Sequence, residues 1–507
     1  MPLYAILPVN CTHEYQVISY CQNIQGMVLN SMQYSGYSTF EKSVNKTGSS
    51  VVFMAKDNEK TFIFISGNDG SRENLGFNGE YLNGGFFRAG LNHENACVLR
   101  KLFPFTAPVR GLIKKQSFGL GDRLGIATPG HIDLFDKNDV FPIFAQQSIR
   151  ELNLTNRTYE DVLDAASFAV FREGYKKGFG ADGDHLKTAK DVEYALSLGF
   201  TMITLDCSEH IKNITPENAS LVSQVLLSDY YKKHFLNREF VFEDIKLVFS
   251  EDELKQCVAI YADAVVFAAG IYNQFFASGK YDADFEISID ETISVTSPLQ
   301  HFFVAHELLA AGVSFATVAP RFCGEFQKGI DYIGDITQFE NEIKVHAAIA
   351  RHFGYKLSIH SGSDKFSVFP VIGSTTKGNF HVKTAGTNWL EAMRVVAITD
   401  PSLYREVHNY ALSAFDEARK YYLVTTDLSQ APDISTLKDS ELPDLFSNNA
   451  VRQIIHITYG LILSLKNSDN SFVFKDRLYS LWQQNEGEYR SALVKHIGRH
   501  LELLNNK

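Results

Sequence analysis

The chain has 507 residues, of which 45% are hydrophobic and 13% aromatic, a composition typical of a globular protein that can bury a large core. Acidic residues outnumber basic ones by 59 to 48, which gives a formal charge of −11 and argues against nucleic acid or an anionic membrane as partners. Chains of this length exceed the usual single domain, so we expect one large domain with attachments.

The N-terminal segment MPLYAILPVNCTHEYQ does not have the basic region and long apolar core of a secretory signal. No uninterrupted apolar run reaches the roughly 18 residues that suggest a membrane span. We therefore expect a cytoplasmic protein that acts on a small molecule, and the sequence leaves open whether it forms a homo-oligomer.

From Val51 to about Arg100 the chain carries the runs VVFMA and TFIFISG, followed by a segment rich in Gly and Asn. Short apolar runs joined by turn-forming residues are typical of a small antiparallel sheet. We therefore assign residues 1–110 to a β-rich N-terminal domain.

Beyond residue 110, short apolar runs alternate with helical stretches, which is the pattern of repeated strand and helix units around a parallel sheet. The count predicts a (β/α)8 barrel over residues 111–465, with an insertion near 207–284 and C-terminal helices over 466–507. A doubly wound open sheet is the alternative. The eight expected strands are Arg123–Gly130, Gly178–Asp184, Phe200–Asp206, Phe285–Glu291, Val313–Arg321, Tyr355–Gly362, Asn379–Gly386 and Tyr421–Asp427.

Alternate side chains of a barrel strand point inward, and active sites gather at the carboxyl ends of the strands. This rule places His360 and His381 on inward faces, and His185 directly follows the expected strand GFGADGD within the segment GFGADGDHLKT. A single His more often serves a buried hydrogen bond, but three at strand ends favour a metal site. We therefore predict that they bind a divalent cation, which could be zinc, manganese or nickel.

Carboxylates meet these imidazoles at the same rim. Asp184 precedes His185, and Asp290 with Glu291 ends the run FEISIDE, so two acids could exchange protons with a substrate. The same acids could instead cap helices or pair with Lys187 and Arg321. The turn residue His131 is a weaker candidate for a supporting role.

Cations near the strand ends could hold an anionic substrate group, because guanidinium and ammonium groups bind carboxylates well. Salt bridges within the site explain them equally well. The candidates are Arg321, Lys383 and Lys365, with Lys328 as a further one.

Several familiar motifs are absent from the sequence. GFGADG fits neither phosphate-binding glycine pattern, HSGSD has the wrong spacing for a nucleophile elbow, and His306 with Glu307 lacks the second His of a zinc protease motif. Nucleotide binding and serine hydrolysis are therefore not expected.

Eight segments of the chain resemble the tagaturonate/fructuronate epimerase family, and together they run from about Arg123 to Gly460. The segments are RLGIATPGH, GFGADGDHLKT, FTMITLDCSEHI, SIDET, APRFCGEFQKGIDYIGD, KLSIHSGSDKF, FHVKTAGTNWLEAMRV and VRQIIHITYG. Because several of these segments are long and have unusual amino-acid sequences, chance similarity is a poor explanation.

The resemblance implies an isomerase, a metal-dependent epimerase that interconverts D-tagaturonate and D-fructuronate at carbon 4 in hexuronate catabolism. It also implies side activity on tagatose and fructose. In the family pattern Asp184 is an acid/base residue and His185 a metal ligand, a second acid/base residue lies in SIDET, and His360 is a further ligand. His381 rests mainly on strand geometry, and Glu325 or Asp331 could take its place.

The hydrogen on carbon 4 is not adjacent to the ketone at carbon 2, so simple enolisation cannot remove it. Two routes remain open: retro-aldol cleavage between carbons 3 and 4 with re-addition, or migration of the carbonyl to carbon 3 before deprotonation. Both gain from a metal that stabilises an oxyanion. The alternative functions are another metal-dependent ketose isomerase or aldolase, and a sugar-acid binding protein without turnover.

Overall fold

The computed structural model describes residues 36–58, 60–67, 74–83, 85–215 and 217–505, so the N-terminal segment analysed above lies outside it. The chain divides into two compact units. The first comprises Met1–Ala107 with Ser167–Lys176, and the second comprises Pro108–Ala166 with Lys177–Lys507. We describe each unit by itself.

The first unit is built on an antiparallel sheet. Its path runs β1, β3, β4, β6, β5, with β2 paired to β3. Both faces of the central strand are covered, because Val52 and Met54 belong to one apolar cluster while Val51 and Phe53 belong to another. The elements are β1 Ser38–Thr39, β2 Asn45–Thr47, β3 Ser50–Lys56, β4 Thr61–Gly67, β5 Gly79–Tyr81, β6 Phe86–Ala89 and helix α2 His93–Leu102.

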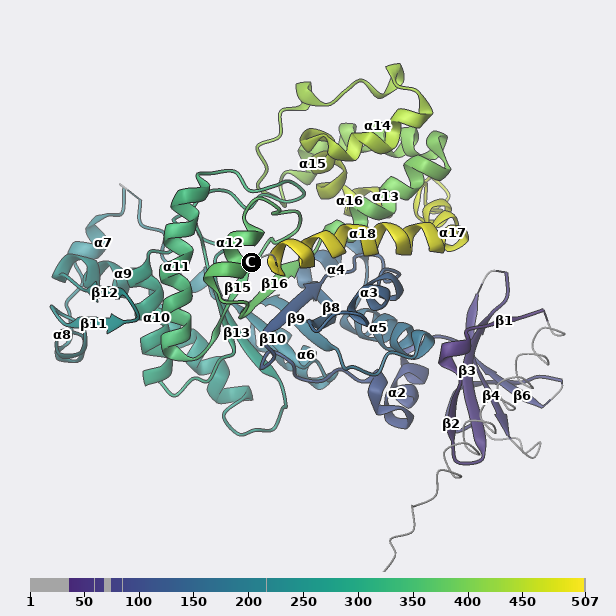
Figure 1. The fold of residues 1–507 in the computed structure, drawn as a ribbon, viewed down its shortest axis with the longest axis horizontal. Coiled ribbons are helices and arrows are strands. Elements are labelled where there is room, and N and C mark those ends of the chain that lie inside the picture. The colour runs from purple at the N-terminus through teal and green to yellow at the C-terminus, as the bar shows by residue number, and fades with distance from the viewer. Residues whose placement is uncertain (1–35, 59, 68–73, 84, 216, 506–507) are drawn as a thin grey trace, which may run out of the picture. The chain divides into compact units, whose positions relative to one another are not determined.

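The second unit contains a closed barrel of eight parallel strands in the order β10, β13, β14, β15, β16, β7, β8, β9, which confirms the predicted fold class (Figure 1). The strands are short and almost entirely buried, as expected for a parallel sheet that is covered by helices. They are β7 Gln116–Leu120, β8 Phe141–Ser148, β9 Gly180–Leu186, β10 Met202–Asp206, β13 Asp284–Ile289, β14 Thr317–Pro320, β15 Lys356–Ile359 and β16 Phe380–Thr384.

Helices follow the strands and continue beyond the last of them. The first group is α3 Thr128–Phe135, α4 Ile149–Thr155, α5 Tyr159–Glu173, α6 Ala189–Ser197, α9 Glu251–Phe275, α10 Pro298–Ala310, α11 Ile336–Phe353 and α12 Phe369–Thr375. The second group is α13 Thr387–Thr399, α14 Pro401–Ala418, α15 Asn449–Ile457, α16 Tyr459–Ser464, α17 Lys475–Gln484 and α18 Glu486–Asn505. The long helix α18 packs against α3, α12 and α13 (Figure 1).

Two of the eight expected strands are wrong. The first, Arg123–Gly130, is a turn that leads into α3: Asp122 accepts hydrogen bonds from the backbone N–H groups of Leu124, Gly125 and Ala127, and Pro129 occupies the first turn of the helix. The second, Tyr421–Asp427, is an extended segment that is assigned neither helix nor strand, although the structure describes all of it. Its apolar alternation reflects burial on one side.

Two strands that the sequence analysis missed complete the barrel. β7 is short and contains a glycine, while β8 contains Pro142 near its start, a residue that normally argues against a central strand. Strand β8 carries Gln146 and Ser148 toward its carboxyl end, and Arg150 follows directly. These three residues line a cavity at the carboxyl end of the barrel.

The predicted insertion lies between β10 and β13. It holds the short helices α7 Ser220–Ser223 and α8 Asp229–His234, the hairpin of β11 Glu239–Phe242 with β12 Ile245–Val248, and the long helix α9. Helix α9 is long and apolar enough to cross a membrane by length and composition. Half of its most apolar window is buried inside the structure, and core helices of soluble proteins pass the same test, so this is weak support for a membrane span.

The structure confirms the inward periodicity expected for the later strands. Lys356 and His381 both reach Ser117 inside the barrel, at 2.9 Å each, while Glu286, His360 and Lys383 meet nearer the carboxyl ends. Leu357 and Val382, the intervening residues, belong to the apolar core. The barrel interior is thus unusually polar, with ionisable side chains in successive layers.

A buried ion cluster ties α18 to the loop that follows β15. Asp364 accepts hydrogen bonds from Arg452 and His496, and its backbone N–H donates to His500 Nε2 at 3.0 Å. Burial opposes ionisation of Asp364, but Arg452 and His496 hold the pKa of its carboxyl well below the usual range. The cluster therefore contributes stability through an ionised, fully partnered aspartate.

We predict that Asp364→Asn lowers the free energy of unfolding by about 3–5 kcal/mol at neutral pH, because Arg452 is left buried beside a neutral group. Since the folded-state pKa of Asp364 is depressed, its contribution is complete above the unfolded pKa of about 3.9 and is lost as pH falls through the folded value. Urea unfolding from neutral to acidic pH measures this.

The gap between wild type and Asp364→Asn should close below about pH 4. Asp416→Asn serves as control because the Asp416 side chain is 89% exposed and lies 4.0 Å from Arg419. We expect it to change stability by less than about 0.5 kcal/mol at any of these pH values. A gap that stays constant across the acidic range would contradict the role given to Asp364.

Candidate active site

Side chains from several strands converge at the carboxyl end of the barrel. Strand β9 brings Asp184 and His185, the end of β13 brings Asp290, and the end of β15 brings His360. His185 has a backbone φ of +55°, a left-handed conformation that side chains rarely adopt. Strained backbone of this kind concentrates at functional sites, and here it turns the imidazole at the strand end.

Three of these side chains form a compact group of possible metal ligands. One ligand atom each from His185, Asp290 and His360 lies within 4.8 Å of the others. The two imidazole rings meet edge to face with centroids 4.8 Å apart, and His360 Nδ1 lies 3.2 Å from Asp290 Oδ1. Two imidazoles and one carboxylate with this spacing match the donor set of a catalytic divalent cation that keeps positions open for substrate.

Each imidazole also has a carboxylate on its other side. Glu286 Oε1 lies 2.8 Å from His360 Nε2, and Asp206 Oδ2 lies 3.6 Å from His185 Nδ1. Burial by itself would lower the pKa of His360, but Asp290 and Glu286 raise it to about 10. Metal-binding histidines commonly carry such an outer carboxylate, which fixes the ring and makes the other nitrogen a better ligand.

Lys383 lies at the centre of the buried acids. Its ammonium is 2.7 Å from Asp182, 2.5 Å from Asp184 and 3.3 Å from Glu286, and its side chain is 4% exposed. Burial favours neutral lysine, but the three carboxylates raise its pKa well above the usual value. Burial together with Asp184 and Glu286 raises the pKa of Asp182 to about 6, against the opposing effect of Lys383. The positive charge of Lys383 thus offsets the repulsion among the buried acids.

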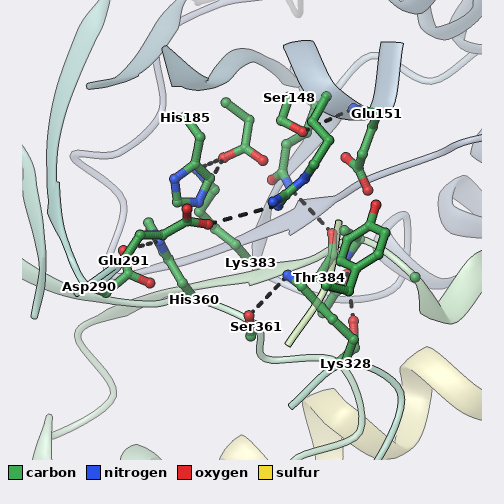
Figure 2. A pocket seen from close by; sticks show the side chains of 17 residues that line it. Ser148, Glu151, His185, Asp290, Glu291, Lys328, His360, Ser361, Lys383 and Thr384 are labelled. Carbon is green, nitrogen blue, oxygen red and sulfur yellow. Dashed lines mark hydrogen bonds and ion pairs between the residues drawn. The ribbon is translucent and has the colours of Figure 1, made fainter. Parts of the chain in front are cut away.

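A narrow, polar cavity opens over these groups. Figure 2 shows His185 on one side of it and Lys328 on another. The acids Asp184, Asp290 and Glu291 line the part near the imidazoles. Most of the remaining wall is formed by hydroxyl, amide and cationic side chains, and Glu151 adds a further carboxylate: Gln146, Ser148, Arg150, Glu151, Lys328, Ser361, Ser363, Thr384 and Tyr422.

This chain matches known proteins over nearly its whole length. The family model for tagaturonate epimerase matches residues 40–504. The tagaturonate/fructuronate epimerase of Thermotoga maritima is 44% identical over 476 residues, which cover 92% of this chain and 97% of that protein.

The chain belongs to the tagaturonate epimerase family.

Solved structures agree with this assignment. The native crystal structure of the fructuronate-tagaturonate epimerase UxaE from Cohnella laeviribosi is 46% identical, with a TM-score of 0.91, over 95% of this chain and 99% of that one. A glycerol complex of the same protein is also 46% identical, with a TM-score of 0.90 over the same shares. The resemblance seen in the sequence is therefore confirmed, and the chain is an enzyme of the isomerase class.

The structure places one predicted metal ligand away from the other two. His381 lies two residues before Lys383 on β16, one layer deeper in the barrel, where its Nδ1 is 2.9 Å from Ser117. Burial lowers the pKa of His381 to about 3. Asp290, which we expected to transfer protons, lies among the converging atoms instead, so we replace His381 with Asp290 in the ligand set proposed below.

The predicted substrate-binding cations already have partners within the protein. Lys365 donates to the backbone carbonyls of Gln327, Ile330 and Ser363, which uses all three of its N–H groups. Lys383 is held by carboxylates, as described above. Arg321 donates to the carbonyl of Thr292 and lines a second, outer cavity. Of the three, Lys383 lines the cavity over the imidazoles and Arg321 lines the outer one, while Lys365 is used by the backbone.

The weaker candidates have structural partners. His131 lies on α3, where its Nε2 is 3.0 Å from Asn388 Oδ1. Asp331 accepts hydrogen bonds from Ser367, and Glu325 lines the outer cavity. Sequence reasoning missed Arg150 because it missed β8, although a strand ending in QQS before a helix could have indicated a polar strand end.

Proposed function

We propose that this chain interconverts D-tagaturonate and D-fructuronate by inverting carbon 4, with the help of a divalent cation held by His185, Asp290 and His360. The observation that carries the proposal is the convergence of these three side chains at the mouth of a barrel that matches the epimerase family. The outer carboxylates Glu286 and Asp206 support it, because they leave one nitrogen of each imidazole for a ligand.

The donor set suits zinc, manganese or nickel, since two neutral imidazoles and one carboxylate are ligands common to all three. A cation bound there would act as a Lewis acid that polarises oxygen atoms of the ketose. The remaining side chains of the pocket orient the sugar acid and exclude water around it. The polar wall suits a polyhydroxylated substrate better than an apolar one.

We assign the proton transfers to two carboxylates of the cavity. Asp184 lies 2.5 Å from the Lys383 ammonium, which favours its ionised form, and an ionised carboxylate accepts a proton. Glu291 lines the same cavity from the end of β13 and has a 39% exposed side chain, so it can exchange protons with substrate and solvent. We propose that these two acids share the proton transfers at the reacting carbons.

Analysis of the products from tagaturonate tests this function. The proposal expects fructuronate, whereas an aldolase would release two three-carbon fragments and a ketose isomerase would form galacturonate. A binding protein would return tagaturonate unchanged. Recovery of fragments or of galacturonate as the main product, in the presence of manganese, zinc or nickel, would overturn the proposal.

The two chemical routes differ in where solvent hydrogen enters the product. Carbonyl migration removes the hydrogen on carbon 4 and replaces it from solvent, while retro-aldol cleavage keeps that hydrogen on carbon 4. Epimerisation in deuterated water, followed by NMR of the product, separates them. Solvent label at carbon 4 would rule out the retro-aldol route alone.

We predict that Glu291→Gln and Asp290→Asn fail in different ways. Glu291→Gln should keep its bound metal and lose about 10²-fold in kcat, because the neutral amide cannot exchange protons. Asp290→Asn should lose metal affinity together with activity, because an amide is a poorer ligand than a carboxylate. Metal content measured beside kcat for both variants decides between the roles. Loss of metal from Glu291→Gln would contradict them.

A further inference from the structure

The cavity wall carries cationic side chains that have no role in the chemistry proposed near the imidazoles. Acids and imidazoles gather at the ends of β9, β13 and β15, while Lys328 and Arg150 add positive charge to the rest of the wall, which also includes Glu151. Figure 2 shows Lys328 apart from His185, bonded to Ser361. Lys328 lies in the loop after β14, and Arg150 lies in the first turn of α4, directly after β8.

Lys328 has no anionic partner among the described residues. Its ammonium donates to Ser361 Oγ at 3.1 Å, and the described part of the chain places no carboxylate within 4.0 Å of it. Glu151, an acid that lines the same cavity, is already paired: its Oε1 lies 2.9 Å from Arg123 Nε, with both side chains almost fully buried. Burial and the nearby Arg150 lower the pKa of Lys328, against the opposing effects of Glu151 and Glu291.

Arg150 also has hydrogen-bond donors that are not fully satisfied within the described residues. Its Nη1 donates to the carbonyl of Tyr421 at 3.4 Å, its Nη2 lies 3.8 Å from Glu291, and its buried Nε has no hydrogen-bond partner in the described structure. The guanidinium lies 4.9 Å above the ring of Tyr422, which fixes its plane. An oriented guanidinium with spare donors, beside an unpaired ammonium, is a suitable site for a carboxylate.

We infer that Lys328 and Arg150 bind the carboxylate of the sugar acid and thereby make the enzyme selective for uronates over neutral ketoses. This inference rests on the proposed function, because it takes the reacting carbons of the same substrate to lie toward His185 and His360. The serine hydroxyls beside Lys328 complete the polar wall around the carboxylate. Neutral ketoses such as tagatose and fructose leave both cations unpaired, so they bind more weakly.

Paired ligands test the inference without turnover. D-Mannonate keeps the carboxylate of fructuronate with its ketone reduced, and D-mannitol replaces that carboxylate with an alcohol. Calorimetry should show that the wild-type chain binds mannonate more tightly than mannitol. Lys328→Met should weaken mannonate binding about 10- to 100-fold and change mannitol binding less than about twofold. Arg150→Met should show the same selectivity of effect.

Lys344→Met is the matched control, because Lys344 is exposed on α11 and pairs with Asp244. Circular dichroism and thermal melting check the fold, which Lys328→Met should preserve because it removes an unpaired cation and keeps the apolar stem. In kinetics with tagaturonate, KM should rise more than kcat falls.

Equal affinity of the wild type for mannonate and mannitol would overturn the inference, and so would equal losses for both ligands or an unchanged mannonate affinity in Lys328→Met. Failure of the proposed function is visible separately, as wild-type protein that binds mannonate through Lys328 but forms no fructuronate from tagaturonate.

Discussion

His185→Ala and His360→Ala should each abolish metal binding and reduce epimerase activity about 10³-fold or more. Each substitution removes one of three converging ligand groups, and a cation that stabilises an oxyanion contributes several kcal/mol to the transition state, at about 1.4 kcal/mol per tenfold in rate. The measurements are metal content after dialysis and kcat with tagaturonate. His360→Ala should have the larger effect on structure, since it also removes the imidazole that pairs with the buried Glu286.

A readout that does not depend on turnover supports the same test. Added manganese or zinc should raise the melting temperature of the wild type, because a ligand that binds only the folded state stabilises it. His360→Ala should show a much smaller shift. His352→Ala is the control, because His352 is an exposed residue of α11 and stacks on Phe242. Wild-type metal content in either site variant would contradict the ligand assignment.

Lys383→Met should lower the free energy of unfolding by about 3–5 kcal/mol and leave little epimerase activity. The substitution keeps a side chain of similar length but removes the cation that lies within 3.3 Å of Asp182, Asp184 and Glu286. Three buried carboxylates that lose their shared counter-ion repel one another, and breaking a buried ion pair from one side costs this much. Urea unfolding of the purified variant measures the loss.

A double variant separates the charge from the packing. Asp182→Asn removes one acid of the cluster, so Lys383→Met combined with Asp182→Asn should be more stable than Lys383→Met alone. If the double variant is less stable by the sum of the two single effects, repulsion among the carboxylates does not explain the loss. Lys246→Met is a surface control, because its pair with Glu239 is more than half exposed and should matter little.

The fold class could be predicted because parallel strands and helices alternate along the chain with clear apolar patterns. Six of the expected strands are present, including those that carry His185, Asp290, His360 and Lys383. The other two expectations failed for local reasons. Asp122 organises a turn where an apolar run suggested a strand, and Pro142 lies in a strand that the sequence argued against.

Strand periodicity predicted which side chains of the candidate site point into the barrel. It did not predict how far each side chain lies from the carboxyl end of the barrel. Alternation places both His381 and Lys383 inside the barrel, but it does not say which layer each occupies, and His381 lies one layer too deep to join His185 and His360. In the same way, Lys365 has the charge of a substrate-binding residue but donates to three backbone carbonyls. Partners of this kind come from loops whose paths the sequence does not specify.

The central claim is that a cation held by His185, Asp290 and His360 is required for epimerisation of tagaturonate. It is tested most directly by removing metal from the wild-type protein with a chelator and measuring fructuronate formation by NMR before and after manganese, zinc or nickel is returned. We predict that activity disappears with the metal and returns when one cation is bound per chain. Full activity in protein without detectable metal would contradict the account.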